Sequence, residues 1–211
     1  FAVDTETTEL DVWKAKLLGL SFSWKQGEGY YLVATDERLE ALRPILEDKK
    51  IEKIGHNLKF DAEILRLNGV NIAPLSFDTM LASYLLNPGT RQHSLDALAF
   101  TEFGYEMMPI SALIGPKGKN QAAMADVPLE KLAWYSSEDA DFTWRLYERL
   151  RGKLANIDDA GLFETIEMPT VNVLIDMEMN GITIDSEFLA AMSKKTHARL
   201  KSTEAKINAL A

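Results

Sequence analysis

The chain has 211 residues, a net charge of −9 and no cysteine, and 46% of its residues are hydrophobic. Its length suits one sizeable globular domain with room for part of a second. The missing cysteines exclude disulfides and thiolate metal sites, and no apolar run approaches the roughly 18–20 residues of a membrane span, so we expect no membrane partner. The acidic charge argues against a strong autonomous nucleic-acid binder, although carboxylates that hold divalent cations count as negative in such a sum.

The first half of the chain alternates between strand-like and helix-like patterns. Aromatic and branched residues dominate the predicted strands, which are residues 1–3, 16–24, 29–34 and 51–55. Apolar residues recur at helical spacing in the two predicted helices, residues 36–48 and 57–69. Three leading strands and a later one among helices predict an α/β fold, with a mixed sheet covered by helices.

The second half of the chain is predicted to be almost entirely helical. Helical patterns cover residues 78–86, 94–103 and 129–150, and the sequence GPKGKNQ at residues 115–121 is typical of a loop. The sequence NIDDAG at residues 156–161 breaks the last pattern, and two further helices joined by GITID follow it. We therefore predict one domain over residues 1–160 and a helical segment over residues 161–211, cut from a longer protein.

Two acidic residues end the first strand with one residue between them. Side chains alternate along a strand, so Asp4 and Glu6 point the same way and their carboxylates lie close together. Two like charges side by side at the end of a buried strand are unfavourable unless something neutralises them. A structural D-x-E pair is nevertheless common, so this motif alone does not establish a site.

Two further acids stand out on predicted helices. Asp61 lies early in its helix, next to Phe60, and Asp139 follows Tyr135 by four residues, which places the two on one helix face. Asp141, two positions further on, is expected to face solvent or to cap. Taken singly, each acid is more often an ordinary first-turn or surface residue.

Taken together, these residues resemble a known family of nucleases. The order D-x-E, then Asp in HNLKFD, then Y-x-x-x-D resembles the DEDDy branch of the DnaQ-like exonucleases, which have a ribonuclease-H-like fold. The segments FAVDTETTELD, GHNLKFDAEIL, FDTMLASYLLNP, SLDALA, GKNQ and YSSEDADFTWRL resemble the proofreading domain of bacterial family A DNA polymerases. The tail IEMPTVNVLIDMEMNGITID resembles the start of their polymerase region, at the base of the thumb, so the resemblance covers essentially the whole chain.

The resemblance implies a 3′–5′ exonuclease that hydrolyses the 3′-terminal phosphodiester of DNA and releases 5′-mononucleotides. Two divalent cations, Mg²⁺ or Mn²⁺, are its cofactors, which agrees with hard ions preferring carboxylate oxygens. By the same resemblance Asp4 bridges both ions, Glu6 and Asp139 complete the tighter site, and Asp61 holds the second ion through water. Tyr135, with Glu6, orients the attacking water.

The partners implied are a single-stranded or frayed 3′ end and the rest of the polymerase chain, in the cytoplasm of a bacterium and with its nucleoid. Leu10 matches the family leucine that wedges against the terminal base, Asn57 matches a residue that contacts the terminal nucleotide, and His56 is its neighbour. Leu10 could instead be core, and His56 an ordinary surface histidine. Lys117 and Lys119 lie where they could touch phosphate, although their spacing is not that of a P-loop.

Two other interpretations stay open at this point. A free-standing ribonuclease D-like exoribonuclease shares the five catalytic residue types, and some polymerase relatives keep the fold only as a silent scaffold. The tail favours the polymerase over the ribonuclease, and the presence of all four acids and Tyr135 favours an active enzyme. Trp134 and Trp144 lie on an amphipathic helix and are expected in the core rather than as stacking platforms.

Overall fold

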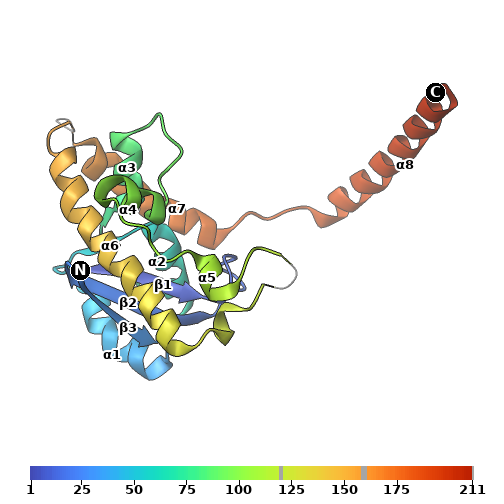
Figure 1. Ribbon diagram of the computed structural model, residues 1–211. Coiled ribbons are helices and arrows are strands. Elements are labelled where there is room, and N and C mark those ends of the chain that lie inside the picture. The colour runs from blue at the N-terminus through green and yellow to red at the C-terminus, as the bar shows by residue number, and fades with distance from the viewer. Residues whose placement is uncertain (119–120, 158–160, 211) are drawn as a thin grey trace. The chain divides into compact units, whose positions relative to one another are not determined.

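The computed structural model describes residues 1–118, 121–157 and 161–210. It divides into two compact units, Phe1–Asp176 and Met177–Ala211. The first unit holds a sheet with most of the helices around it (Figure 1). The boundary that the sequence places at residue 160 lies outside the described residues and stays a prediction.

The elements follow one another much as the sequence predicts. The strands are β1 (Ala2–Thr7), β2 (Leu17–Lys25), β3 (Glu28–Val33), β4 (Lys53–Gly55) and β5 (Leu75–Asp78). The helices are α1 (Asp36–Leu46), α2 (Leu58–Leu67), α3 (Thr79–Leu86), α4 (Leu95–Phe103), α5 (Ile110–Ile114), α6 (Leu129–Leu154), α7 (Met168–Asn180) and α8 (Ser186–Leu210). A 3₁₀ turn at Met124–Asp126 precedes α6, and a π-helical turn at Phe163–Glu167 leads into α7.

The sheet is mixed, as the sequence predicts, and β1 lies at its centre. The strand order is β3-β2-β1-β4-β5. β2 pairs antiparallel with β1 and with β3, whereas β4 is parallel to both β1 and β5. The sequence did not predict β5, because a four-residue strand is too short to show a period and it runs directly into α3. The carboxyl end of β1, where Asp4 and Glu6 lie, therefore opens at the middle of the sheet.

Helix α6 packs directly across β1, β2 and β3 (Figure 1). Its face toward the sheet carries the small residues Ser136 and Ala140, one turn apart and both completely buried. On the sheet, Gly29 lies so close that an added Cβ would overlap the backbone carbonyl of Ser137. The small side chains let the helix backbone approach the strands, and this fixes the height of α6 above β1.

A single buried carboxylate fixes the first residues of both α2 and α3. Asp78, at the end of β5, accepts hydrogen bonds from the backbone N–H groups of Leu58 (2.8 Å) and Asn57 (3.2 Å) at the head of α2. It also accepts from the N–H groups of Met80 (2.8 Å) and Leu81 (3.2 Å) at the head of α3. Because these N–H groups have no partner within their helices, Asp78 sets where α2 begins beside β1.

Two expectations for residues of α6 were wrong. Trp134 is 63% exposed rather than in the core, because its face of the helix points away from the sheet. Asp141 is buried rather than solvated, since it lies over the turn between β2 and β3. Its carboxylate accepts a hydrogen bond from the N–H of Gly27 at 2.7 Å and pairs with Arg145 at 2.5 Å.

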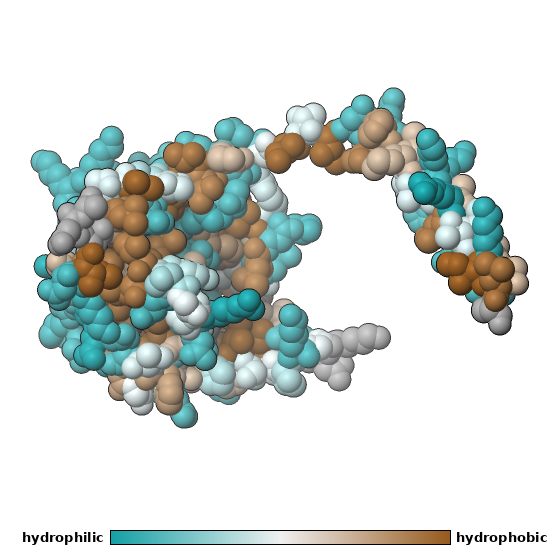
Figure 2. Space-filling model, turned by 90° about the horizontal axis from the view of Figure 1, so that it is seen from above, coloured by the Kyte–Doolittle hydropathy of each residue, from teal (hydrophilic) through white to brown (hydrophobic). Residues whose placement is uncertain are grey.

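The second unit contains the end of α7 and the whole of α8, the two helices predicted after residue 161. Every described residue of α8 is exposed, including large apolar ones such as Phe188, Met192 and Ile207. Figure 2 shows hydrophobic residues at the surface of this helix. None of the helices in the described ranges combines the length and apolar character needed to cross a bilayer.

The contact between Gly29 and Ser137 predicts a specific loss of stability. In Gly29→Ala the new methyl group meets helix backbone that cannot move away easily, so the free energy of unfolding should fall by about 1–3 kcal/mol, measured by urea denaturation. Gly152→Ala is the matched control, because Gly152 lies in α6 with open space around it. That variant should be unchanged or more stable. Equal stability of both variants would contradict close packing of α6.

Candidate active site

One cleft of about 900 Å³ is lined by every residue that the sequence predicts for catalysis and substrate binding. These residues are Asp4, Glu6, Leu10, His56, Asn57, Asp61, Tyr135 and Asp139. They come from three parts of the chain: the end of β1 with its following loop, the head of α2, and the middle of α6. The fold thus brings segments that are far apart in sequence to one place.

Three of the acids form a tight group at the floor of this cleft. One carboxylate oxygen from each of Asp4, Glu6 and Asp139 lies within 4.8 Å of the others. Glu6 is buried, and its Oε1 has no hydrogen-bond partner among the residues that the structure describes. A buried carboxylate oxygen without a donor is costly, and three carboxylates at this spacing offer the oxygen ligands that Mg²⁺ and Mn²⁺ prefer.

The electrostatics of the group agree with a need for positive charge. Burial, followed by the charges of Asp61, Asp139 and Glu6, raises the pKa of Asp4 well above its ordinary value. Burial, followed by the charge of Glu6, does the same to the pKa of Asp139. Burial raises the pKa of Glu6 to about 7. The protein has concentrated negative charge where its own groups do not neutralise it.

The fourth acid, Asp61, is held from the opposite face of β1. The side chain of Thr5 points away from those of Asp4 and Glu6 because side chains alternate along a strand. Its hydroxyl donates to Oδ1 of Asp61 at 2.6 Å, and its backbone N–H donates to the same oxygen at 2.9 Å. These bonds fix the carboxylate and leave its Oδ2 unused by them. Burial raises the pKa of Asp61 to about 7.

Tyr135 stands one turn before Asp139 on α6 and lines the same cleft. Burial, and then the charges of Asp139 and Glu6, raise the pKa of the Tyr135 phenol well above its ordinary value. The phenol therefore stays protonated at neutral pH and can orient a water molecule, but it is poorly suited to act as a base.

The residues predicted to bind substrate occupy the rim and one side of the cleft. Leu10 is 87% exposed, so it is not a core residue. Asn57 is exposed and has a left-handed backbone (φ 62°) at the head of α2. The Nδ1 atom of His56 lies 2.9 Å from the hydroxyl of Thr79, and burial lowers the His56 pKa to about 4, so its ring is neutral. Lys117 lines the cleft, and Lys119 lies outside the described residues.

The sequence did not predict one wall of the cleft. This wall includes Ile110, Ser111 and Ile114 of α5 and Ala122 and Met124 after it. A five-residue helix is too short to show a helical period, and its surroundings were expected to be loop. The apolar residues one turn apart at positions 110 and 114 are the only local signal that could have indicated it.

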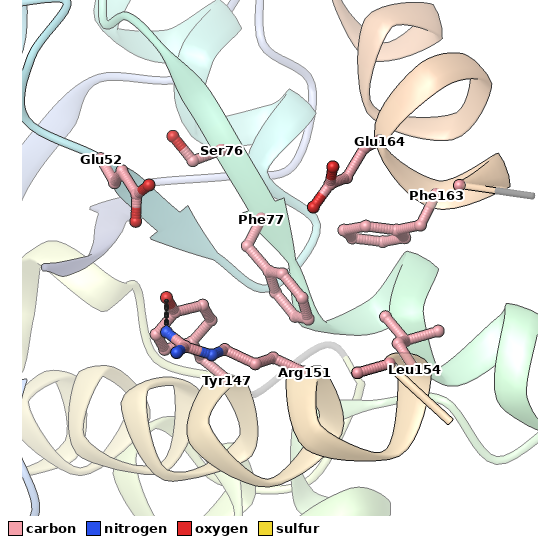
Figure 3. A pocket seen from close by; sticks show the side chains of 10 residues that line it. Glu52, Ser76, Phe77, Tyr147, Arg151, Leu154, Phe163 and Glu164 are labelled. Carbon is pink, nitrogen blue, oxygen red and sulfur yellow. Dashed lines mark hydrogen bonds between the residues drawn. The ribbon is translucent and has the colours of Figure 1, made fainter. Parts of the chain in front are cut away.

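A second, smaller pocket of about 440 Å³ lies elsewhere on the first unit (Figure 3). Its lining includes the labelled residues Glu52, Ser76, Phe77, Tyr147, Arg151, Leu154, Phe163 and Glu164. The rings of Phe77 and Phe163 are 4.7 Å apart, and Arg151 donates to the hydroxyl of Tyr147 at 2.7 Å. Because this lining includes none of the predicted site residues, the carboxylate cleft is the candidate active site.

The raised pKa values predict how stability depends on pH without metal. Glu6 and Asp61 have a pKa of about 7 in the folded protein but about 4 in an unfolded chain, so the folded state holds more protons between these values. The stability that these two groups contribute to the fold is therefore fully present below about pH 4 and is lost as the pH rises through about 7. In EDTA, the melting temperature should fall between about pH 5 and pH 8.

The variant Glu6→Gln and added Mg²⁺ provide the controls for this effect. Glu6→Gln should flatten the fall in melting temperature, because one of the buried acids no longer ionises. Mg²⁺ should raise the melting temperature more at pH 8 than at pH 5, because ionised carboxylates bind it better. If the melting temperature falls with pH equally steeply in wild type and in Glu6→Gln, Glu6 is not buried in the way that raises its pKa.

Comparison with known proteins shows which family this chain resembles. A family model described as 3′-5′ exonuclease matches residues 1–155. DNA polymerase I of Pseudomonas aeruginosa is 34% identical over 96% of this chain and 24% of its own length. DNA polymerase I of Borreliella burgdorferi is 38% identical over 98% of this chain and 23% of its own length. The chain thus spans about a quarter of the length of these curated relatives.

Solved structures agree on the fold. The POL domain of Pol1 from M. smegmatis, in complex with DNA primer-template and dNTP, has a TM-score of 0.76 at 24% identity, covering 95% of this chain and 32% of that one. Brucella melitensis NrnC has a TM-score of 0.67 at 21% identity, covering 85% of each chain. These likenesses confirm the predicted ribonuclease-H-like α/β fold. Because the family model matches most of this chain, residues 1–155, the chain belongs to the 3′–5′ exonuclease family of the DNA polymerase I type.

Proposed function

We propose that this chain removes nucleotides from the 3′ end of DNA, as the proofreading part of a bacterial DNA polymerase. One observation carries the proposal: four acids and a tyrosine from separate segments meet in the cleft of a 3′–5′ exonuclease domain. The relatives named DNA polymerase I support DNA as the substrate and a polymerase chain as the partner. They favour this function over that of a free-standing exoribonuclease. The expected location is the bacterial cytoplasm, with the nucleoid.

The donor atoms of the cleft fit two divalent cations, Mg²⁺ or Mn²⁺. Asp4, Glu6 and Asp139 would hold one cation, for which the unpartnered Oε1 of Glu6 is a suitable ligand. Asp61, whose Oδ2 is not used by Thr5, would hold the second with Asp4. When bound, such cations supply a hydroxide-like nucleophile and stabilise charge on the leaving oxygen.

The other residues of the cleft act on water and on the substrate. Tyr135, protonated at neutral pH, would orient the attacking water together with Glu6. Asn57 and Leu10 would contact the terminal nucleotide, the first through its exposed amide and the second through an exposed apolar side chain. His56, being neutral, would contribute by shape and hydrogen bonding rather than by charge. A single-stranded or frayed end fits such a cleft better than a stacked, paired end.

Residues 161–211 are proposed to begin the polymerase region. The family model ends at residue 155, but the curated relatives match almost the whole chain. The exposed apolar residues of α8 agree with a helix that packs against further parts of a longer protein.

The test is digestion of a 5′-labelled single-stranded DNA in the presence of Mg²⁺. The wild-type chain should produce a ladder that shortens from the 3′ end and should release nucleoside 5′-monophosphates. Asp4→Asn removes the shared carboxylate charge without changing shape, so cleavage should fall by at least about a thousandfold. Glu37→Gln, an exposed acid of α1, is the control and should be fully active.

Three outcomes would overturn the proposal. They are cleavage that persists in EDTA, full activity of Asp4→Asn, and digestion of a matched RNA much faster than of the DNA. The last would instead support the exoribonuclease.

Replacing Tyr135 separates water positioning from metal binding. Tyr135→Phe keeps the ring but removes the hydroxyl, so kcat should fall by about 10- to 100-fold because the water is no longer held in line. The affinity for Mn²⁺, measured by calorimetry, should be unchanged. A parallel loss of Mn²⁺ affinity would show that the hydroxyl supports the carboxylates rather than the water.

A further inference from the structure

The part of the cleft's wall that α5 forms has little packing of its own. We call residues 110–114 and 122–124 the cleft wall. The N–H of Ala122 donates to the carbonyl of Ile114 at 2.9 Å and joins its two parts. Helix α5 contributes no buried residue, and Ile110 and Ser111 are exposed in the cleft. Met124, at the other end of the wall, is buried. Because α5 itself buries so little apolar surface, its position depends on where the chain is attached on either side.

Both attachments lead to α6, the helix that carries Tyr135 and Asp139. At its end the wall passes into the 3₁₀ turn at Met124–Asp126, which Pro128 and the first residue of α6 follow. Before the wall, the hydroxyl of Tyr105 donates to Oε1 of Glu138 at 2.8 Å. The backbone N–H of Met108 donates to Oε2 of Glu138, also at 2.8 Å. One carboxylate thus uses both oxygens to hold the approach to the wall.

Aromatic and apolar contacts support the same attachment. The ring of Tyr105 stacks on Phe142 of α6 with the ring centroids 4.5 Å apart. Met107, between the two hydrogen-bonded residues, is buried against Phe142 and Ala99. Glu138 therefore lies at the polar edge of a small packed cluster, and hydrogen bonds to a charged acceptor are stronger than neutral ones.

We propose that Glu138 is a positioning residue for substrate binding. It lies next to Asp139 in the chain but faces a different groove, lined also by Tyr105 and Trp134, so it does not reach into the active-site cleft. By holding residues 105–108 on α6, it keeps the cleft wall at a fixed distance from the catalytic residues of that helix. Without these hydrogen bonds, residues 105–108 are held to α6 by the contacts of Tyr105 and Met107 with Phe142 alone. The wall is then held less firmly, and ordering it would oppose substrate binding.

The geometry specifies which substitution should rescue the attachment. In Glu138→Gln the amide oxygen can still accept from the N–H of Met108, and the amide NH₂ can donate to the hydroxyl of Tyr105. Glu138→Gln therefore keeps the attachment and loses only the charge beside Asp139. Glu138→Ala loses both. The pair separates positioning of the wall from any electrostatic effect on Asp139.

The experiment combines hydrogen exchange with steady-state kinetics on the full chain. In Glu138→Ala, peptides covering residues 105–114 should exchange faster than in wild type, whereas in Glu138→Gln they should not. KM for single-stranded DNA should rise by about tenfold in Glu138→Ala, equivalent to about 1.4 kcal/mol of binding. Its kcat should be unchanged, because only uniform binding is lost. Glu148→Ala, an exposed acid on the same helix, is the control.

The two readouts distinguish failure of this proposal from failure of the proposed function, on which only the kinetic part rests. Unchanged exchange in Glu138→Ala would overturn the attachment whether or not the chain degrades DNA. A fall in kcat at constant KM, shared by Glu138→Gln, would overturn it in favour of a charge effect on Asp139. If the wild type lacks nuclease activity, the proposed function fails, and the exchange data still decide on the attachment.

Discussion

The close approach of α6 to the sheet is the contact on which the rest of the structure depends. Ser136 and Ala140 are completely buried against the strands, and Gly29 leaves no room for a side chain beneath Ser137. A helix one methyl group further away would lift Asp139 from the acids of β1. The geometry of the carboxylate group is therefore set by small residues that carry no chemistry, through packing that has little tolerance.

This packing gathers negative charge that the protein does not neutralise by itself. Burial raises the pKa of Asp4, Glu6 and Asp61, and the charges of Asp61, Asp139 and Glu6 raise the pKa of Asp4 further. Such a group lowers the stability of the metal-free fold, which is a common feature of functional sites. Rigid supports offset the repulsion: Thr5 fixes Asp61, and Asp78 fixes the helix that carries it. The electrostatic repulsion within the site is thus offset by ordinary hydrogen bonds between backbone and side-chain groups.

Much of the fold was predictable, because its longer elements have clear local patterns. The antiparallel strands before residue 34, the helix of residues 57–69 and the long helix from residue 129 each carry a period that indicates their type. The elements that were missed, β5 and α5, are too short for a period to show. Trp134 and Asp141 were assigned to the wrong environments for another reason. Which face of a helix is buried depends on what packs against it, and the turn between β2 and β3 covers Asp141 from a distant part of the chain.

The sequence by itself determined which side chains could act together locally. Alternation along a strand pairs Asp4 with Glu6, and helical spacing pairs Tyr135 with Asp139, because both periods follow from backbone geometry alone. Only the tertiary structure decided that the two pairs share one cleft and that Glu138 holds its wall through its bonds to residues 105 and 108. Contacts between distant segments depend on how whole elements pack, and packing is a property of the complete fold rather than of any local stretch of sequence.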